Sequence, residues 1–324
     1  DRKQKKKLRA KRVVLSAGCL GTNEIMLRSK EKGAIPNLSD QLGNGFSTNG
    51  DNFYLLGQTR ERIRSTRGPA QSSHAQFNLT DPGNTSSSEN IFHMIEDLGI
   101  PPALATTVGF GKSLFAILTK GQHKILALSF ALIGFISRRI WILITGPFKN
   151  KLVRQDMFKN EDEASSNFLI VTTTGREQAK AKIKLGGGWM QTPLRMERKD
   201  NFNNKELFIN DPVYKNIQVT LDKMSKVFAD ENAKGGDEKF FSPAGTTIAC
   251  SHPLGGCRIG NNASEGVVNE FGHVFDTSKG PEGIHNGLYI ADGSVIPTSL
   301  GVNPSLSIAA VCWYIANNMR KELN

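Results

Sequence analysis

The first fifty residues alternate short apolar runs with glycine-rich turns. Residues 12–18 (RVVLSAG) predict a buried strand, and apolar positions between Asn23 and Ser29 then recur at helical spacing. A strand, a glycine turn and a helix in this order form half of a βαβ unit. The next segment, residues 42–51, is rich in Gly and Asn and predicts an irregular loop whose backbone approaches another group closely.

The middle of the chain, from about Tyr54 to Phe241, has a mixed pattern. Residues 168–174 (FLIVTTT) predict a strand, and residues 216–228 predict a helix. Stretches rich in Pro, Gly and Ser, at 80–88 and 234–245, predict loops. The pattern shows no internal repeat, and these loops leave the domain boundaries loosely defined.

The last eighty residues carry sharper signals. Residues 266–275 predict two short strands across a turn, and residues 287–291 predict another strand. A final helix is predicted from Asn303 to about Lys321. Its start is well marked, because Asn303 is a favoured N-cap and Pro304 suits the first helical position.

The most apolar stretch runs from Lys124 to Gly146. Its uninterrupted apolar part extends only from Ile125 to Ile136, before Arg138 and Arg139, which is too short to span a bilayer. A buried or interfacial helix is the simplest interpretation. The alternative is contact with one membrane surface, with the apolar face in lipid and the two arginines at its edge.

Composition excludes collagen-like, low-complexity and wholly disordered classes, because 38% of the 324 residues are hydrophobic and 22% are charged. The net charge is +11, but residues 1–12 contribute +7 through eight Lys or Arg against one Asp, which leaves +4 for the rest. Such a local run is typical of a solvated arm. Without interleaved aromatic residues or a reading module, it argues against a nucleic-acid partner.

Four cysteines are too few for a disulfide scaffold and favour a reducing compartment such as the cytoplasm. The chain begins with Asp1 and has no signal-peptide pattern. We therefore expect that processing or truncation set this start and that N-terminal targeting information is missing.

The densest chemical cluster is Cys250-Ser-His252-Pro-Leu-Gly-Gly-Cys257. A zinc site would use both cysteines and His252, but the spacing fits no usual ligand pairing. A catalytic thiol would have His252 as its activating neighbour, without any further signature of thiol chemistry. Two interpretations stay open: His252 is a general base in a bent glycine loop that passes close to a flat ligand, or it is a hydrogen-bonded core histidine.

Two more motifs suggest a ligand. Asp292-Gly293 follows a predicted strand, where the carboxylate could accept hydrogen bonds from sugar or ribityl hydroxyls and the glycine lets a phosphate approach the backbone. Asn303-Pro304 begins the last helix, whose free N–H groups favour an anionic or electron-rich partner. The structural alternatives are a turn for Asp292 and a simple N-cap for Asn303.

These residues together resemble the C-terminal signature of the glucose-methanol-choline (GMC) family of FAD oxidoreductases. The matching segments are residues 252–258, 266–268, 287–297 and 300–308, in the family's order. Residues 13–22 (VVLSAGCLGT) are similar to the family's second flavin-contacting strand-turn-helix. The resemblance implies FAD as cofactor, bound by Ala17, Gly18, Gly21, Thr22, Asn49, Gly50, Asp292, Gly293, Asn303 and Pro304.

The pairing of a histidine with an asparagine resembles the cholesterol oxidase branch, where they correspond to His252 and Asn303. That branch also carries a glutamate facing the flavin, which Glu96 resembles, although the adjacent Asp97 would take this place if the register moved by one residue. The implied reaction is oxidation of a hydrophobic alcohol, sterol-like or long-chain, to a ketone or aldehyde. Hydride would pass to FAD, His252 or Glu96 would take the hydroxyl proton, and oxygen is one expected electron acceptor.

The family's G-x-G-x-x-G fingerprint is absent from the chain. We therefore expect an α/β (α+β) fold with an incomplete Rossmann-like FAD-binding domain, residues 1–57 and 246–324, that lacks its N-terminal βαβ unit. Residues 58–245 would form a substrate domain on an antiparallel sheet, with the apolar run 125–144 at the substrate entry. An upstream segment of roughly 150–250 residues should carry the fingerprint, because strand 12–16 needs parallel neighbours.

Two other functions compete with this interpretation. One is an inactive C-terminal fragment of a GMC flavoprotein, which keeps the signature without a pyrophosphate site. The other is a lipid-surface binding module that uses the apolar stretch together with the basic N-terminal run.

Overall fold

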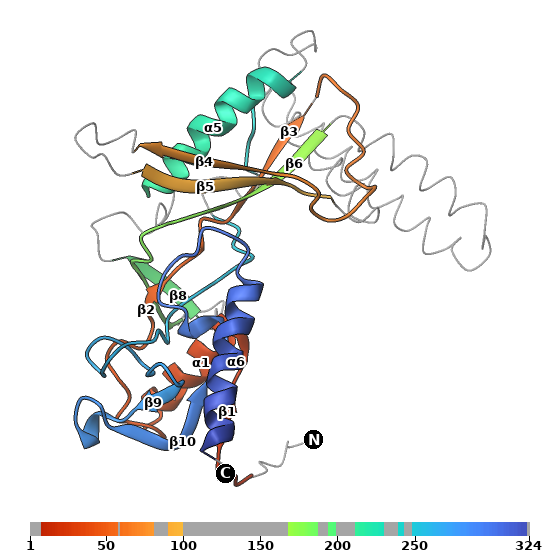
Figure 1. Ribbon diagram of the computed structural model, residues 1–324. Coiled ribbons are helices and arrows are strands. Elements are labelled where there is room, and N and C mark those ends of the chain that lie inside the picture. Colours follow the sequence, from red (N-terminus) through yellow and green to blue (C-terminus); the bar gives the residue numbers. More distant parts are fainter. Residues whose placement is uncertain are drawn as a thin grey trace, which may run out of the picture.

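The computed structural model describes residues 8–57, 59–80, 90–99, 168–186, 194–198, 211–229, 239–242 and 248–322. Within them the chain forms a lower and an upper region, with both termini at the lower end (Figure 1). Most of the loop predicted at 80–88 and the whole apolar stretch 124–146 lie outside the described residues. None of the described helices is both long enough and apolar enough to cross a membrane.

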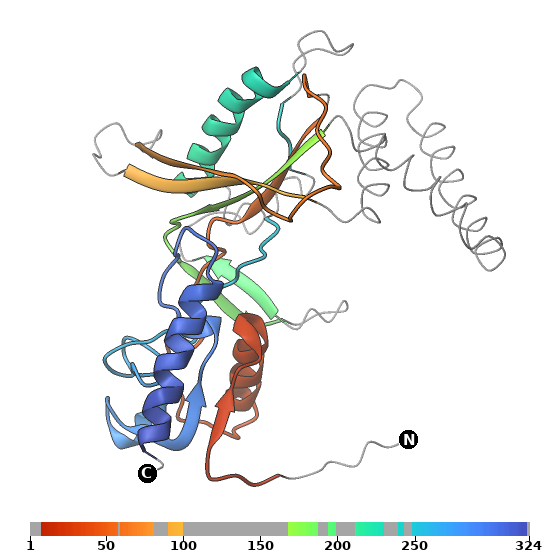
Figure 2. The same ribbon diagram turned by 45° about the vertical axis from the view of Figure 1, so that its right-hand side comes forward.

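The lower region contains a three-stranded sheet in the order β1-β10-β9. Strands β1 (Val13–Leu15) and β10 (Ile284–Ile290) are parallel, and β9 (His273–Phe275) runs antiparallel to β10. Helices α1 (Gly18–Glu31) and α6 (Ser305–Lys321) lie beside this sheet (Figure 2). Its buried core includes Met26, Leu38, Leu42, Val267, Val268, Val274, Ile290, Val295 and Ile315.

The upper region is a four-stranded antiparallel sheet covered by one helix. Its strands are β3 (Asn52–Gly57), β6 (Phe168–Gly175), β5 (Asn90–Asp97) and β4 (His74–Thr80), in that order. Helix α5 (Pro212–Phe228) packs on one face of this sheet (Figure 1). The side chains of the shared core include Tyr54, Leu56, Ile95, Val171, Val213, Tyr214, Ile217 and Leu221.

A second three-stranded sheet, β2-β7-β8, lies between these regions (Figure 1). It consists of β2 (Asn44–Phe46), β7 (Ala181–Leu185) and β8 (Leu194–Arg198), all antiparallel. Strand β2 falls inside the segment that the sequence predicts to be an irregular loop. The close approach is real, because a Cβ on Gly43 would lie 2.1 Å from the carbonyl oxygen of Ile183.

Most predicted elements occur where the sequence places them, with further differences besides β2. The strand predicted to be buried at 12–18 covers only Val13–Leu15, and Val13 and Val14 are exposed, because no strand among the described residues covers its outer side. Residues 266–269 form no strand of their own, since Val268 makes only single bridges to Ile259 and Val274. Helix α6 starts at Ser305 with Pro304 in the N-cap position and no side-chain cap. The prediction that Asn303 caps this helix is therefore wrong, because its side chain makes other contacts.

Candidate active site

The candidate site lies where the upper and lower regions meet. Asp51 immediately precedes β3, and Glu96 lies near the end of β5. His252 belongs to the 250–257 loop, and Asn303 lies just before α6. The site therefore combines side chains from both regions.

The loop that carries His252 is fixed by backbone pairing. Leu254 and Ser47 exchange two N–H···O hydrogen bonds of 2.9 and 3.0 Å. Gly255 has a φ of +83°, and a Cβ there would lie 2.0 Å from the carbonyl oxygen of Gly45. The glycines thus let the loop approach the protein's own chain, rather than the flat ligand that the sequence suggests.

Asp51 is fully buried and binds the His252 segment through both carboxylate oxygens. Its Oδ1 lies 2.9 Å from Nδ1 of His252, and its Oδ2 accepts the backbone N–H groups of Ser251 and His252 at 2.7 and 2.6 Å. The hydrogen bond with Asp51 raises the pKa of His252 above its ordinary value, although burial opposes it. Sequence reasoning missed Asp51, whose only signal is a carboxylate ending a Gly- and Asn-rich loop.

Glu96, Asn303 and Gln71 form one hydrogen-bonded group. Nδ2 of Asn303 donates to Oε1 of Glu96 at 3.1 Å, and Nε2 of Gln71 donates to Oε2 of Glu96 at 2.9 Å. Burial raises the pKa of Glu96, while Asn303 and His252 oppose the shift. Oδ1 of Asn303 is enclosed and has no partner among the described residues, so this acceptor is available to a ligand.

The register of β5 distinguishes Glu96 from its neighbour. Successive side chains of a strand point to opposite faces, so Glu96 faces Asn303 and Asp97 does not. The carboxylate of Asp97 instead accepts hydrogen bonds from Ser72 and Ser73. The catalytic role of Glu96 stays a prediction.

The cysteines near His252 have the properties of packed thiols. Burial raises the pKa of Cys19, Cys250 and Cys257 far above the ordinary range of a thiol, which disfavours thiolate chemistry. The thiol of Cys250 donates to the carbonyl oxygen of Thr48 at 3.4 Å. In the described part of the chain, no group of three or more His, Cys, Asp or Glu side chains could hold a metal ion.

The predicted cofactor-binding residues 17–18 and 292–293 lie together, because they follow the parallel strands β1 and β10 at the same edge of the sheet. Asp292 is buried, with Oδ2 accepting from Thr22 Oγ1 at 2.5 Å and Oδ1 accepting from the Ser294 N–H at 2.8 Å. Each carboxylate oxygen keeps a lone pair for another donor. This arrangement suits a ligand that carries hydroxyl groups.

The surroundings of these residues also fit a dinucleotide. Gly18 has a φ of +75°, and a Cβ built on it meets no atom within 4 Å, so the backbone there borders open space. A Cβ on Gly21 would lie 3.0 Å from the Cβ of Ala17, which explains a glycine at that position. The enclosed hydroxyl of Ser294 has no partner among the described residues. FAD fits this donor and acceptor set.

Asn49 and Gly50 contact the protein itself. Asn49 has a φ of +60°, and its side chain binds the 300–302 turn by accepting two backbone N–H groups at 2.9 Å and donating to a carbonyl oxygen at 2.8 Å. A Cβ on Gly50 would lie 2.3 Å from the backbone nitrogen of Gly175. Their role as cofactor contacts stays a prediction, as does that of Pro304.

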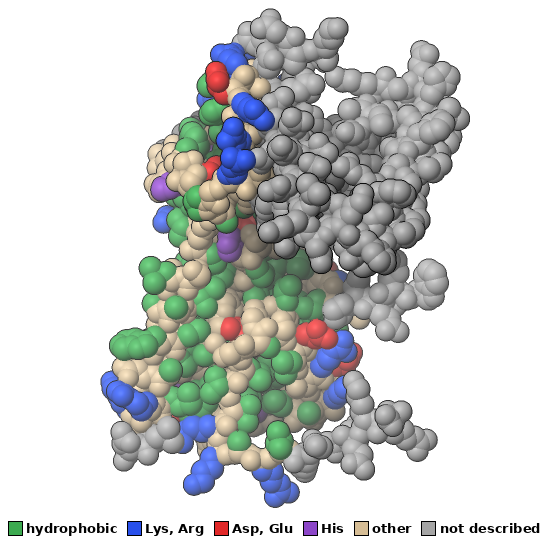
Figure 3. Space-filling view, turned by 90° about the vertical axis from the view of Figure 1, so that its right-hand side faces the viewer, with side chains coloured by type: hydrophobic (Ala, Val, Ile, Leu, Met, Phe, Trp, Pro, Cys, Tyr) green, Lys and Arg blue, Asp and Glu red, His purple; other side chains and the backbone are tan. Residues whose placement is uncertain are grey.

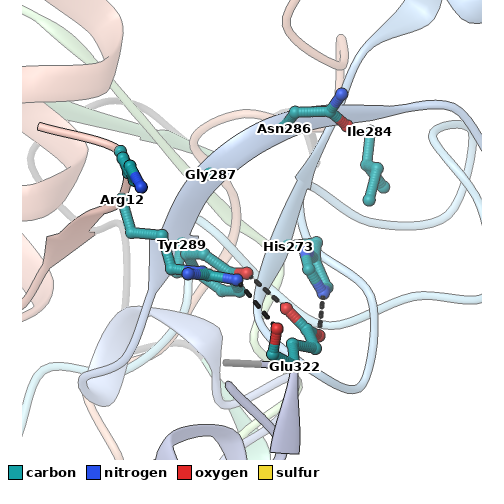
Figure 4. A pocket seen from close by; sticks show the side chains of 8 residues that line it. Arg12, His273, Ile284, Asn286, Gly287, Tyr289 and Glu322 are labelled. Carbon is teal, nitrogen blue, oxygen red and sulfur yellow. Dashed lines mark hydrogen bonds and ion pairs between the residues drawn. The ribbon is translucent and has the colours of Figure 1, made fainter. Parts of the chain in front are cut away.

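A cavity of about 580 Å³ lies at the opposite end of the parallel pair (Figure 4). Its polar groups bind one another: Glu322 accepts from the Tyr289 hydroxyl at 2.6 Å and lies 3.0 Å from Nε2 of His273, while Arg12 donates to the Glu322 carbonyl oxygen. This network attaches the end of α6 to the sheet. Ligands of α/β sheets bind at the carboxyl ends of strands, so this cavity is not the candidate site.

One face of the lower region is unusually apolar. Figure 3 shows hydrophobic side chains gathered over this part of the molecule. Leu306 is 81% exposed and Trp313 is 69% exposed, both on α6. Further exposed apolar side chains on β1, α1 and α6 are Val13, Val14, Leu20, Ile25 and Tyr314. We call these seven residues the apolar face.

Comparison with known proteins finds similarity to one family of oxidoreductases. Residues 204–312 match the C-terminal domain of the GMC oxidoreductases. The chain is 27% identical to a cholesterol oxidase of Acinetobacter baumannii over 314 residues, which cover 95% of this chain and 47% of that protein. It is 30% identical to the long-chain-alcohol oxidase FAO3 of Arabidopsis thaliana over 107 residues, or 33% of this chain and 12% of that protein.

These matches agree with the predicted resemblance to the GMC oxidoreductases, a family whose cofactor is FAD. Among solved structures, a formate oxidase variant of Aspergillus oryzae superposes with a TM-score of 0.51 at 13% identity, over 96% of this chain and 54% of that one. This similarity shows the mixed α/β fold. The chain spans about half the length of the first relatives that it matches.

Proposed function

We propose that this chain is the C-terminal part of an FAD-dependent oxidoreductase that converts a hydrophobic alcohol to a ketone or aldehyde. The observation that carries the proposal is the juxtaposition of the Asp51–His252 pair with the hydrogen-bonded group of Glu96, Asn303 and Gln71. FAD, when bound, would accept the hydride from the carbinol carbon.

His252 is the better candidate to take the hydroxyl proton. Asn303 and Gln71 each donate a hydrogen bond to Glu96, and a donor to a carboxylate lowers its affinity for a proton. Among the described residues, no hydrogen bond engages Nε2 of His252, and Asp51 binds the other ring nitrogen. Asn303, with its free Oδ1, would orient the substrate hydroxyl, and Glu96 would hold Asn303 in place.

The nucleotide-binding part of the site would be completed by polypeptide that packs on the apolar face. Strand β1 pairs only with β10 among the described strands, and Val13 and Val14 are 46% and 41% exposed. A parallel strand normally has both faces covered. Residues 1–57 and 246–324 would then belong to one FAD-binding domain, and 58–245 to the substrate domain.

The proposed substrate class is a sterol or a long-chain alcohol, and oxygen is the proposed acceptor. Support comes from the His252 and Asn303 pairing and from the names of the relatives, a cholesterol oxidase and a long-chain-alcohol oxidase. The apolar run 125–144 is proposed to cover the substrate entry, where it would contact the surface of a lipid bilayer.

Initial rates measured on the complete protein test this proposal. The substrates are a sterol, a long-chain primary alcohol, glucose and choline, and hydrogen peroxide formation reports oxygen as the acceptor. We expect turnover of a hydrophobic alcohol and negligible turnover of the other two. A preference for glucose or choline would contradict the proposed substrate, and a purified protein with no flavin absorbance would favour an inactive fragment.

A further inference from the structure

Asp51 is placed as a buried partner of His252, not as a surface carboxylate. It is 0% exposed and accepts four hydrogen bonds, three from Ser251 and His252 backbone or hydroxyl donors and one from the His252 ring. The two backbone donors and the Ser251 hydroxyl all bind Oδ2, which leaves Oδ1 to the imidazole. The carboxylate is therefore held in one orientation, with Oδ1 facing Nδ1 of the imidazole.

This geometry determines which ring nitrogen carries the proton. An ionised carboxylate can only accept hydrogen bonds, so the Nδ1 that lies 2.9 Å from Oδ1 must be protonated. A neutral imidazole protonated at Nδ1 has its lone pair at Nε2. The base proposed above needs that lone pair toward the substrate.

The other titratable groups around Asp51 leave it as the main charge on this side of His252. Burial raises the pKa of Glu177 to about 7, and it raises those of Tyr214 and Cys250 as well. These shifts disfavour the charged forms of all three groups. On the opposite side, Glu96 is the carboxyl group that interacts electrostatically with His252.

We propose that Asp51 is a positioning residue that fixes His252 in its Nδ1-protonated form and increases the basicity of Nε2. This inference rests on the proposed function, because it assigns His252 as the base. A purely structural role would be different. Asp51 would then only hold the 250–254 loop through the backbone donors, and the pKa and tautomer of the His252 ring would not depend on the charge of Asp51.

Asp51→Asn in the complete protein separates these roles, because asparagine keeps the shape and removes the charge. We expect kcat/KM for the alcohol to fall by roughly 10²–10⁴. The acid limb of its pH profile should move to lower pH by about one unit or more, because the imidazolium loses its counter-charge. Asp276→Asn is the matched control, since Asp276 also lies beside a histidine, His285 at 3.5 Å, outside the candidate site.

Nuclear magnetic resonance of 15N-labelled histidines gives a second readout that needs no turnover. In the unmodified protein above the pKa of His252, the ring should be protonated at Nδ1, and Asp51→Asn should lower that pKa. An Nε2-protonated ring, or a pKa unchanged in folded Asp51→Asn, would overturn the proposal. The tautomer of the unmodified protein decides the matter if the variant does not fold. Failure of the alcohol assay alone would contradict the proposed function and leave these spectra unaffected.

Discussion

Helices α5 and α6 have the same length, 17 residues, but they are covered to very different extents. Both helices expose three large apolar side chains: Val219, Val227 and Phe228 on α5, and Leu306, Trp313 and Tyr314 on α6. Helix α5 nevertheless buries seven residues against the upper sheet, whereas α6 buries only Ile315. A contiguous exposed apolar patch marks a surface that another surface covers. Among the described residues, α5 thus contributes to a buried core along its length, whereas the apolar face of the lower region is left uncovered.

The largest effect is expected where the two regions meet. In the complete protein, His252→Ala should leave FAD bound and lower alcohol oxidation by roughly 10²–10⁴, the scale for losing a positioned base. The control is His285→Ala, which removes a histidine of the lower region far from the site in sequence. Activity within a few-fold of that of the unmodified protein would contradict the proposal that His252 is the base and would leave it a structural histidine.

The contrast between the helices can be measured as stability. Leu221→Ala in α5 should lower the free energy of unfolding of the chain by about 2–5 kcal/mol, because it leaves a cavity in the core between α5 and the upper sheet. Trp313→Ala in α6 should change it by less than about 0.5 kcal/mol. Chemical denaturation compares the two. A large effect of Trp313→Ala in this chain would show that α6 is already covered.

Stability should also depend on pH through Glu177, which supports the turn between the regions by accepting the Thr48 N–H. Burial raises its pKa from 4.5 to about 7, so the folded protein holds this proton more tightly than the unfolded chain. The associated stability is full below pH 4.5 and is lost as pH rises through 7. That loss amounts to about 3 kcal/mol.

Glu177→Gln should therefore lose less stability than the unmodified protein between pH 5 and pH 8. Glutamine keeps an acceptor for the Thr48 N–H and cannot ionise. Denaturation curves at both pH values measure this difference, and Glu31→Gln, an exposed change on α1, is the control. Parallel pH dependence in all three proteins would refute the assignment.

The smallest expected effects are at the starts of the same two helices. Asp211 caps α5 by accepting the Val213 N–H at 3.2 Å, so Asp211→Ala should cost about 1 kcal/mol and speed amide exchange in the first turn. Asn303 does not cap α6, so Asn303→Ala should leave exchange in the first turn of α6 unchanged. Hydrogen exchange resolved by residue distinguishes these outcomes, and faster exchange in α6 would restore the capping role.

Local patterns predicted much of the fold. The strand before Gly18, the strand before Asp292 and the final helix follow from apolar runs bounded by Gly, Asp and Pro. Ordered motifs from residue 252 to residue 308 indicated the family and its FAD cofactor, because those residue types stand at fixed spacing. Such signals are local, so they need no knowledge of which segments pack together.

The tertiary structure alone decided how the site is assembled. Asp51 meets His252 across 201 residues, and Glu96 meets Asn303 across 207. No periodicity links such positions, and a one-residue ambiguity between Glu96 and Asp97 is resolved only when β5 pairs with its neighbours. Local sequence therefore specified the elements and the resemblance to a family, while long-range pairing selected which carboxylates face the histidine and the asparagine.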